Sequence, residues 1–116
     1  MGVEEDIATF QEMEKRLQST MMQKYQFQLQ LNEINLAMDE LKEYEGKSVF
    51  KMVGPVMIEK DKEKALEELE STKKFVEAKL KVLHEDEEKM KSTLQRLYKK
   101  IEEGMHGAEQ GKGGTN

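Results

Sequence analysis

The chain has 116 residues, of which 36% are hydrophobic and 37% are charged, and its mean hydropathy is -0.84. This composition supplies too few apolar side chains for a deep globular core, and with one proline and no tryptophan it is typical of long helices or coiled coils. The 24 acidic and 19 basic residues are interspersed and give a net charge of -5, which argues against nucleic acid as a partner. The absence of cysteine excludes a disulfide framework and a cysteine nucleophile, so we expect a cytoplasmic protein.

The chain offers no signal for a membrane. It lacks a run of about 18 apolar residues, and its acidic start does not resemble a secretory signal. The first residues also fail the myristoylation pattern, because Asp6 stands where that motif needs Ser or Thr. We therefore expect a soluble protein without a membrane partner.

The first predicted element is a coiled-coil helix over about residues 6–44. Alternate steps of three and four residues from Phe10 lead to mostly apolar positions, as a heptad seam requires. These positions are Phe10, Met13, Leu17, Thr20, Lys24, Phe27, Leu31, Ile34, Met38 and Leu41. Gly46 is placed to end this helix in a left-handed cap.

The second predicted element is a β-hairpin over residues 47–60, rich in β-branched and apolar residues and interrupted by Gly54-Pro55. Phe50 and Met52 point to one face and Val49 and Val53 to the other, so both faces are apolar. An isolated two-stranded ribbon is marginal in water and has two open edges. The hairpin therefore predicts partner strands from other chains.

The third predicted element is a second coiled-coil helix over residues 62–103, with Asp61 as its N-cap. The same three-and-four walk passes through Leu66, Leu69, Lys73, Val76, Leu80, Leu83, Glu87, Met90, Leu94, Leu97 and Ile101. Residues 104–116 are predicted to form a flexible glycine-rich tail. We expect the two helices to fold back antiparallel as one mainly α domain over residues 1–116, each helix reaching on the order of 60 Å.

Apolar residues are abundant where the chain ends are expected to meet. They exceed what one seam needs, Met21 and Met22 lie nearby, and a coiled-coil end frays easily. We interpret this tip as a binding surface for non-native chains, with an ordinary zipper end as the alternative. The tip residues are Ile7, Phe10, Met13, Leu17, Leu94, Leu97, Tyr98, Ile101 and Met105.

Catalysis and cofactor binding find no support in the sequence. His84 and Glu88 supply only two ligands of a helical zinc motif, and residues 107–113 lack the Ser or Thr of a phosphate loop. No nucleophile is accompanied by a base and an orienting group. We predict no enzyme activity, no metal and no cofactor.

The order of long helix, single hairpin and long helix, with the segment from Val49 to Ile58 at its centre, resembles the beta-class subunits of prefoldin over about residues 6–103. The resemblance implies a hexamer of two alpha-class and four beta-class chains whose hairpins close into β-barrels. It further implies ATP-independent capture of unfolded proteins, notably nascent actin and tubulin in eukaryotes, at the tips of the helices. The resemblance finally implies that the captured proteins are delivered to the cytosolic group II chaperonin.

By matching position, the resemblance implies that the inter-subunit contacts are made by Val49, Phe50, Met52, Val53, Val56 and Ile58. It implies that the client-binding end includes Phe10, Met13, Leu17, Leu97, Tyr98 and Ile101. The competing interpretation, from another class of protein, is a structural or tethering coiled coil that recognises a folded partner. A plain tether, however, has no use for an apolar β-segment between two heptad runs.

Overall fold

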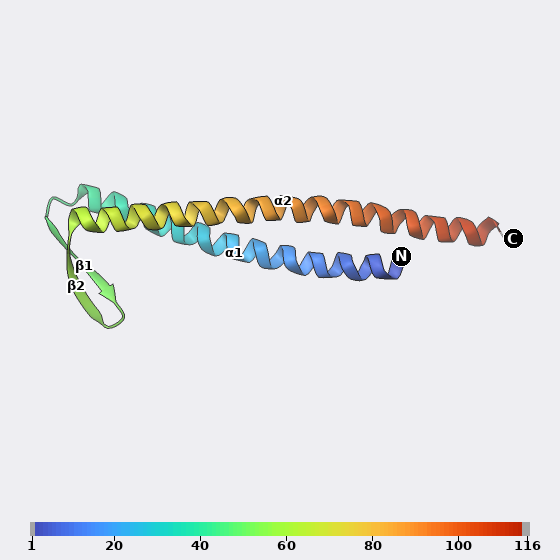
Figure 1. Cartoon of the computed structure of the whole chain (residues 1–116), viewed down its shortest axis with the longest axis horizontal. Helices are drawn as coiled ribbons and strands as arrows, with labels where there is room; N and C mark the ends of the chain where they lie inside the picture. The colour runs from blue at the N-terminus through green and yellow to red at the C-terminus, as the bar shows by residue number, and fades with distance from the viewer. Residues whose placement is uncertain (1, 115–116) are drawn as a thin grey trace. The chain divides into compact units, whose positions relative to one another are not determined.

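The computed structural model describes residues 2–114, with side chains described through residue 107. It contains helix α1 (Val3–Glu43), strands β1 (Ser48–Val53) and β2 (Val56–Asp61), and helix α2 (Lys62–Gly114), as Figure 1 shows. The predicted fold class is confirmed: two long helices are joined by a single β-hairpin. Acidic residues at Glu4, Glu5 and Asp6 favour the positive end of the α1 dipole, and this helix begins earlier than residue 6.

The described residues form two compact units, each containing part of both helices. Unit 1 combines the residues up to Lys24 with those from Leu83 onward, and unit 2 runs from Tyr25 to Val82 and contains the hairpin. Along both helices, every position of the two predicted heptad seams is buried or half-buried. The predicted periodicity therefore identifies the packed face of each helix.

Unit 2 contains the apolar core of the chain. Ile34 and Met38 of α1 and Val76 of α2 are buried, and Val76 has no exposed surface. Half-buried side chains surround them, namely Phe27, Leu31, Leu69 and Leu80. Burying an aliphatic side chain of this size stabilises a fold by roughly 1.5–3 kcal/mol, so this seam contributes strongly to holding the two helices together.

Unit 1 packs the same helices antiparallel, but its buried side chains are polar. Asp6, Thr20 and Glu87 are buried, at 6%, 9% and 6% exposure. Partners run in opposite directions along the two helices, since Asp6 contacts Lys100 at 3.6 Å and Lys24 contacts Glu87 at 2.9 Å. Within the described residues, therefore, the fully buried apolar side chains all belong to unit 2.

Gly46 does not form the predicted left-handed cap. Helix α1 ends at Glu43, and among the described residues Gly54 alone has a positive φ. Gly46 instead lies against the end of the Tyr44 side chain, where a Cβ would require that ring to move. The end of α1 is capped by Lys62, whose Nζ donates to the carbonyl oxygens of Lys42 at 3.5 Å and Tyr44 at 2.5 Å.

Helix α2 continues beyond residue 103, where the sequence predicted its end, to Gly114. One glycine in a helix interior costs about 1 kcal/mol, which is too little to terminate a long helix by itself. Gly104 also has a packing role, because an added Cβ would lie 2.5 Å from Cγ2 of Val3. Residues 115 and 116 of the predicted tail lie outside the described residues.

The hairpin has a two-residue turn at Gly54 and Pro55, between the paired residues Val53 and Val56. Gly54 has φ 58°, and Pro55 cannot adopt a positive φ. Of the two turns that suit short hairpins, type I′ needs positive φ at both central residues and type II′ only at the first. The Gly-Pro sequence therefore selects the type II′ turn and fixes the strand register.

We predict that Gly54→Ala weakens the hairpin by about 1 kcal/mol, because an L-residue is strained at positive φ. Amide hydrogen exchange in β1 and β2 measures the free energy of strand opening. Gly107→Ala is the matched control, since a Cβ there meets nothing within 4 Å and φ is not positive. Equal protection of the strands in wild type and Gly54→Ala would contradict the role of this glycine.

Candidate binding surfaces

The hairpin exposes apolar side chains on both of its faces. The register places Phe50 and Met52 with Met57 on one face, and Val53 and Val56 with Ile58 on the other. Their exposed fractions range from 44% for Ile58 to 68% for Met52. Single-chain folding therefore leaves these side chains in water, which strongly favours cover from another molecule.

Five of the six residues predicted to contact other subunits lie on these open faces. Phe50, Met52, Val53, Val56 and Ile58 are exposed, whereas Val49 is half-buried at the base of the hairpin. Among the described residues the sheet has only two strands, so each strand also has one edge without a strand neighbour. Open edges and apolar faces together form a surface suited to adding strands.

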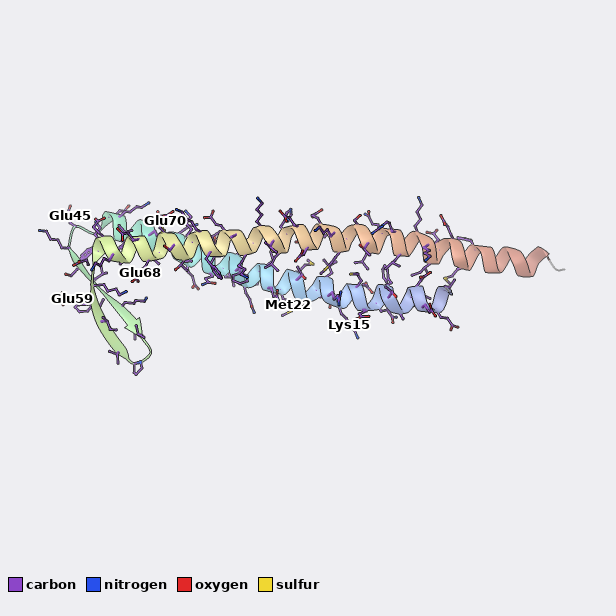
Figure 2. The ribbon with its side chains drawn as sticks, in the orientation of Figure 1. Lys15, Met22, Glu45, Glu59, Glu68 and Glu70 are labelled. Atoms are coloured by element: carbon purple, nitrogen blue, oxygen red, sulfur yellow. The ribbon has the colours of Figure 1, made fainter. Side chains whose placement is uncertain are left out.

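Glu68 of α2 anchors the hairpin to the helix. Its carboxylate accepts hydrogen bonds from Lys51 of β1, at 3.3 Å, and from Lys60 of β2. Figure 2 shows Glu68 on the first turns of α2, beside the base of the hairpin. These bonds, first that from Lys60 and then that from Lys51, lower the pKa of Glu68 below its usual value of 4.5. One carboxylate thus links both strands to α2.

A largely apolar cleft lies between the base of the hairpin and the helices of unit 2. Its apolar lining residues are Ala37, Leu41, Val49, Phe50, Ala65 and Leu69. Lys51, Lys60 and Glu68 form part of its polar rim. The cleft extends the exposed apolar surface of the hairpin onto the helices.

The predicted tip residues are brought together in unit 1, but most of them pack in the seam. Those that are half-buried are Ile7, Phe10, Met13, Leu17, Leu94, Leu97 and Ile101. Tyr98 and Met105 are exposed, at 62% and 52%. The rings of Phe10 and Tyr98 lie 6.5 Å apart at 47°, so Tyr98 covers the edge of the seam. The immediately exposed part of this surface is therefore small.

Polar side chains interrupt the seam of unit 1. Lys24 and Glu87 both occupy seam positions, where they form an ion pair, and Lys91 contacts the other carboxylate oxygen of Glu87 at 3.0 Å. Thr20 donates to the sulfur of Met90 at 3.7 Å. Polar groups in a seam fix the register of the two helices at a cost in stability. Unit 1 therefore has a defined register but a weaker apolar contact than unit 2.

The sequence analysis did not predict the contacts of Glu68 and Lys62 or the pairing of Lys24 with Glu87. The sequence does contain a sign of the Lys24–Glu87 pair, since both residues are charged and occupy positions of mostly apolar heptad walks. No sequence pattern indicated Glu68 or Lys62, because the partners of Glu68 lie on the hairpin and those of Lys62 at the end of α1, and only the folded chain brings them close. Over residues 2–107, no group of three or more acidic or histidine side chains could hold a metal ion. Neither helix, within its described length, is apolar enough to cross a membrane.

Known proteins share the order of helix, single hairpin and helix found in this chain. The family model described as prefoldin subunit matches residues 4–108. The prefoldin beta subunit of Thermococcus onnurineus is 34% identical over 93 residues, covering 79% of this chain and 80% of the relative. The prefoldin beta subunit of Pyrobaculum calidifontis is 27% identical over 116 residues, which cover 95% of this chain and 93% of the relative.

A solved structure shows the same fold. The crystal structure of the prefoldin beta subunit from Thermococcus strain KS-1 is similar with a TM-score of 0.81 and 28% identity, covering 87% of this chain and 90% of that one. Helix, single hairpin and helix thus define a protein of the prefoldin class. The chain belongs to the prefoldin subunit family, and the relatives named here are its beta subunits.

We predict that the Lys24–Glu87 pair makes stability depend on pH. Lys24, followed by Lys91, lowers the pKa of Glu87 below 4.5, and Glu87 raises the pKa of Lys91 above 10.5. A carboxyl group with a lowered pKa stabilises the fold above its unfolded pKa and loses this effect as pH falls through its folded pKa. The stabilisation should be complete near pH 7 and disappear on acidification below about pH 4.

Urea unfolding of wild type and Glu87→Gln between pH 7 and pH 3 measures this effect. The difference in unfolding free energy between the two proteins should shrink on acidification, because Glu87 is then protonated. Glu85→Gln is the control, since Glu85 is an exposed acid on the same helix. A difference that stays constant with pH would show that the pair contributes nothing to folding.

Proposed function

We propose that the chain is a beta-class subunit of a hetero-hexameric prefoldin, a binding protein that acts without ATP and catalyses no reaction. The observation that carries this proposal is the hairpin, whose two faces and two edges are left open by the single chain. Hairpins of neighbouring subunits would cover them and close into a β-barrel. Membership of the prefoldin subunit family supports this assembly.

We further propose that the assembly captures unfolded or nascent proteins at the tip residues of unit 1. Actin- and tubulin-type chains are the proposed clients, and the cytosolic group II chaperonin is the proposed recipient. Three features support a binding role for this unit: exposed Tyr98 and Met105, a seam that lacks a fully buried apolar side chain among its described residues, and the expected fraying of helix ends. A cytoplasmic location follows from this role.

The turn sequence supports a finer assignment. Gly54-Pro55-Val56 resembles the hairpin of the eukaryotic prefoldin subunit six, although the relatives named above are archaeal. We propose that the chain belongs with that eukaryotic subunit. Copurification with a set of several different small subunits, rather than with a single alpha-class partner, would be the expected result.

The alternative function is a tether that binds a folded partner. It is favoured by the packing of most tip residues in the seam, which leaves little apolar surface exposed there. A native mass spectrum of the complex recovered from cells separates the two functions. Six small subunits support the prefoldin proposal, whereas a dimer or one folded partner supports the tether.

We predict that Phe50→Ser with Met52→Ser disrupts assembly while leaving the single chain folded. Both side chains are more than 60% exposed in the single chain, so their replacement should remove mainly contacts that the assembly makes. Each buried apolar side chain contributes about 1.5–3 kcal/mol, so association should weaken by roughly two orders of magnitude or more. Native mass spectrometry measures the loss, with Val82→Ser as an equally exposed control on α2. Intact hexamers would refute the proposed interface.

We predict that Tyr98→Ser with Met105→Ser lowers the suppression of client aggregation severalfold without changing assembly. These side chains are exposed, so their removal should leave the helices paired, as thermal melting can verify. Replacing Phe10, Leu97 and Ile101 together by Ser should abolish suppression, but these residues also belong to the seam. Suppression that survives in both variants would place client binding elsewhere.

A further inference from the structure

Two of the nine methionines of the chain face each other across the hairpin. Met52 of β1 and Met57 of β2 are direct partners in the antiparallel register, so both side chains lie on the same face of the ribbon. They are 68% and 61% exposed, and Met52 is the most exposed large hydrophobic residue in the part of the chain that the structure describes. The pair therefore presents two neighbouring thioether groups to solvent.

Their position separates these two residues from the other methionines that the structure describes. Three methionines in the seam between the helices are buried or half-buried, namely Met13, Met38 and Met90. Three more are exposed on the helices, namely Met21, Met22 and Met105. Among the exposed methionines in the described residues, only Met52 and Met57 lie on a face that the proposed assembly would cover. A chemical change at their sulfur atoms would therefore act on the contacts between subunits.

The thioether of methionine reacts with peroxides. A lone pair of the sulfur attacks one oxygen of hydrogen peroxide, so that an S–O bond forms and the O–O bond breaks. The proton of the attacked oxygen passes to the departing hydroxide, which leaves as water. The sulfur loses two electrons and the peroxide gains them. The product is a polar sulfoxide, whose oxygen accepts hydrogen bonds.

A sulfoxide at this place would oppose assembly. The neighbouring cross-strand pair on the same face is Phe50 with Glu59. Neither of these side chains has a hydrogen-bond donor at neutral pH that could satisfy the new oxygen. Burying a polar group without a hydrogen-bond partner costs free energy. A partner subunit that packs on two apolar methionines would therefore bind the oxidised chain more weakly.

We propose that Met52 and Met57 form a methionine oxidation site that is open to small peroxides in the unassembled subunit, and that oxidation there prevents assembly. Assembly covers the two sulfur atoms and protects them from the oxidant. The inference rests on the proposed assembly through the hairpin and adds its control by peroxide. The control is reversible, because methionine sulfoxide reductases return the sulfoxide to the thioether.

The first experiment measures protection of the two sulfur atoms by assembly. The free full-length chain and the complex recovered from cells are treated with hydrogen peroxide, and peptide mass spectrometry follows sulfoxide formation at each methionine. We expect Met52 and Met57 to react about tenfold more slowly in the complex. Met22, which is 66% exposed on α1, should react equally in both samples. Equal rates at Met52 and Met57 in the two samples would overturn the inference.

The second experiment measures the effect of oxidation on assembly. Met52→Leu with Met57→Leu keeps apolar side chains of similar size that peroxide does not oxidise, and Met21→Leu with Met22→Leu is the matched control on α1. Each full-length chain is treated with hydrogen peroxide, and the excess is removed with catalase. Partner subunits separated from the recovered complex are then added before native mass spectrometry.

We expect about tenfold less complex from oxidised wild type and from the oxidised α1 control, and no loss from the hairpin variant. Reduction of the two sulfoxides by methionine sulfoxide reductases should restore assembly of wild type. An oxidised wild type that assembles in full, or a hairpin variant that loses assembly as wild type does, would overturn the inference and leave the proposed function standing. An untreated wild-type chain that forms no six-chain complex would overturn the proposed function and this inference with it.

Discussion

An open hairpin that is apolar on both faces is the constraint on which the rest of this protein depends. Six apolar side chains, from Phe50 through Ile58, remain 44–68% exposed, and two strand edges have no strand neighbour among the described residues. Such a ribbon is marginal for one chain in water. Further strands that cover its faces and edges would therefore stabilise it. Glu68 links both strands of the hairpin to α2, and Lys62 links the start of α2 to the end of α1.

The buried side chains of the seam between the helices are apolar in unit 2 and polar in unit 1. In unit 2, which contains the hairpin, Ile34, Met38 and Val76 form a buried apolar layer between the two helices. In unit 1 the buried positions are Asp6, Thr20 and Glu87, which specify the register but contribute less apolar burial. The stronger apolar seam therefore lies in the unit that contains the hairpin, and the weaker one lies in the unit that contains the proposed client-binding tip.

The exposed surfaces of the chain differ in chemistry according to their proposed partners. The hairpin exposes valine, isoleucine, methionine and phenylalanine beside open strand edges, which suits the regular strands of other subunits. On α1, Tyr25 and Leu29 are also exposed, and Lys24 is the only charged residue from Gln18 to Asn32. Methionines Met21 and Met22 on α1 are exposed as well, and flexible side chains of this kind adapt to many shapes.

The sequence by itself determined the features that depend on local spacing. Heptad steps from Phe10 and from Leu66 identified the packed face of each helix. The Gly54-Pro55 pair identified the turn of the hairpin. Both features could be predicted because side-chain periodicity and backbone preference act within a few residues. Only the tertiary structure decided that Gly46 makes room for Tyr44, that Lys24 pairs with Glu87, and that Tyr98 and Met105 stay exposed where their neighbours are covered. The pairing of Lys24 with Glu87 joins residues distant in sequence, and its geometry depends on how the two helices are aligned, which no single stretch of sequence specifies. The approach of Tyr44 to Gly46 is local, but it depends on the path of the chain after α1.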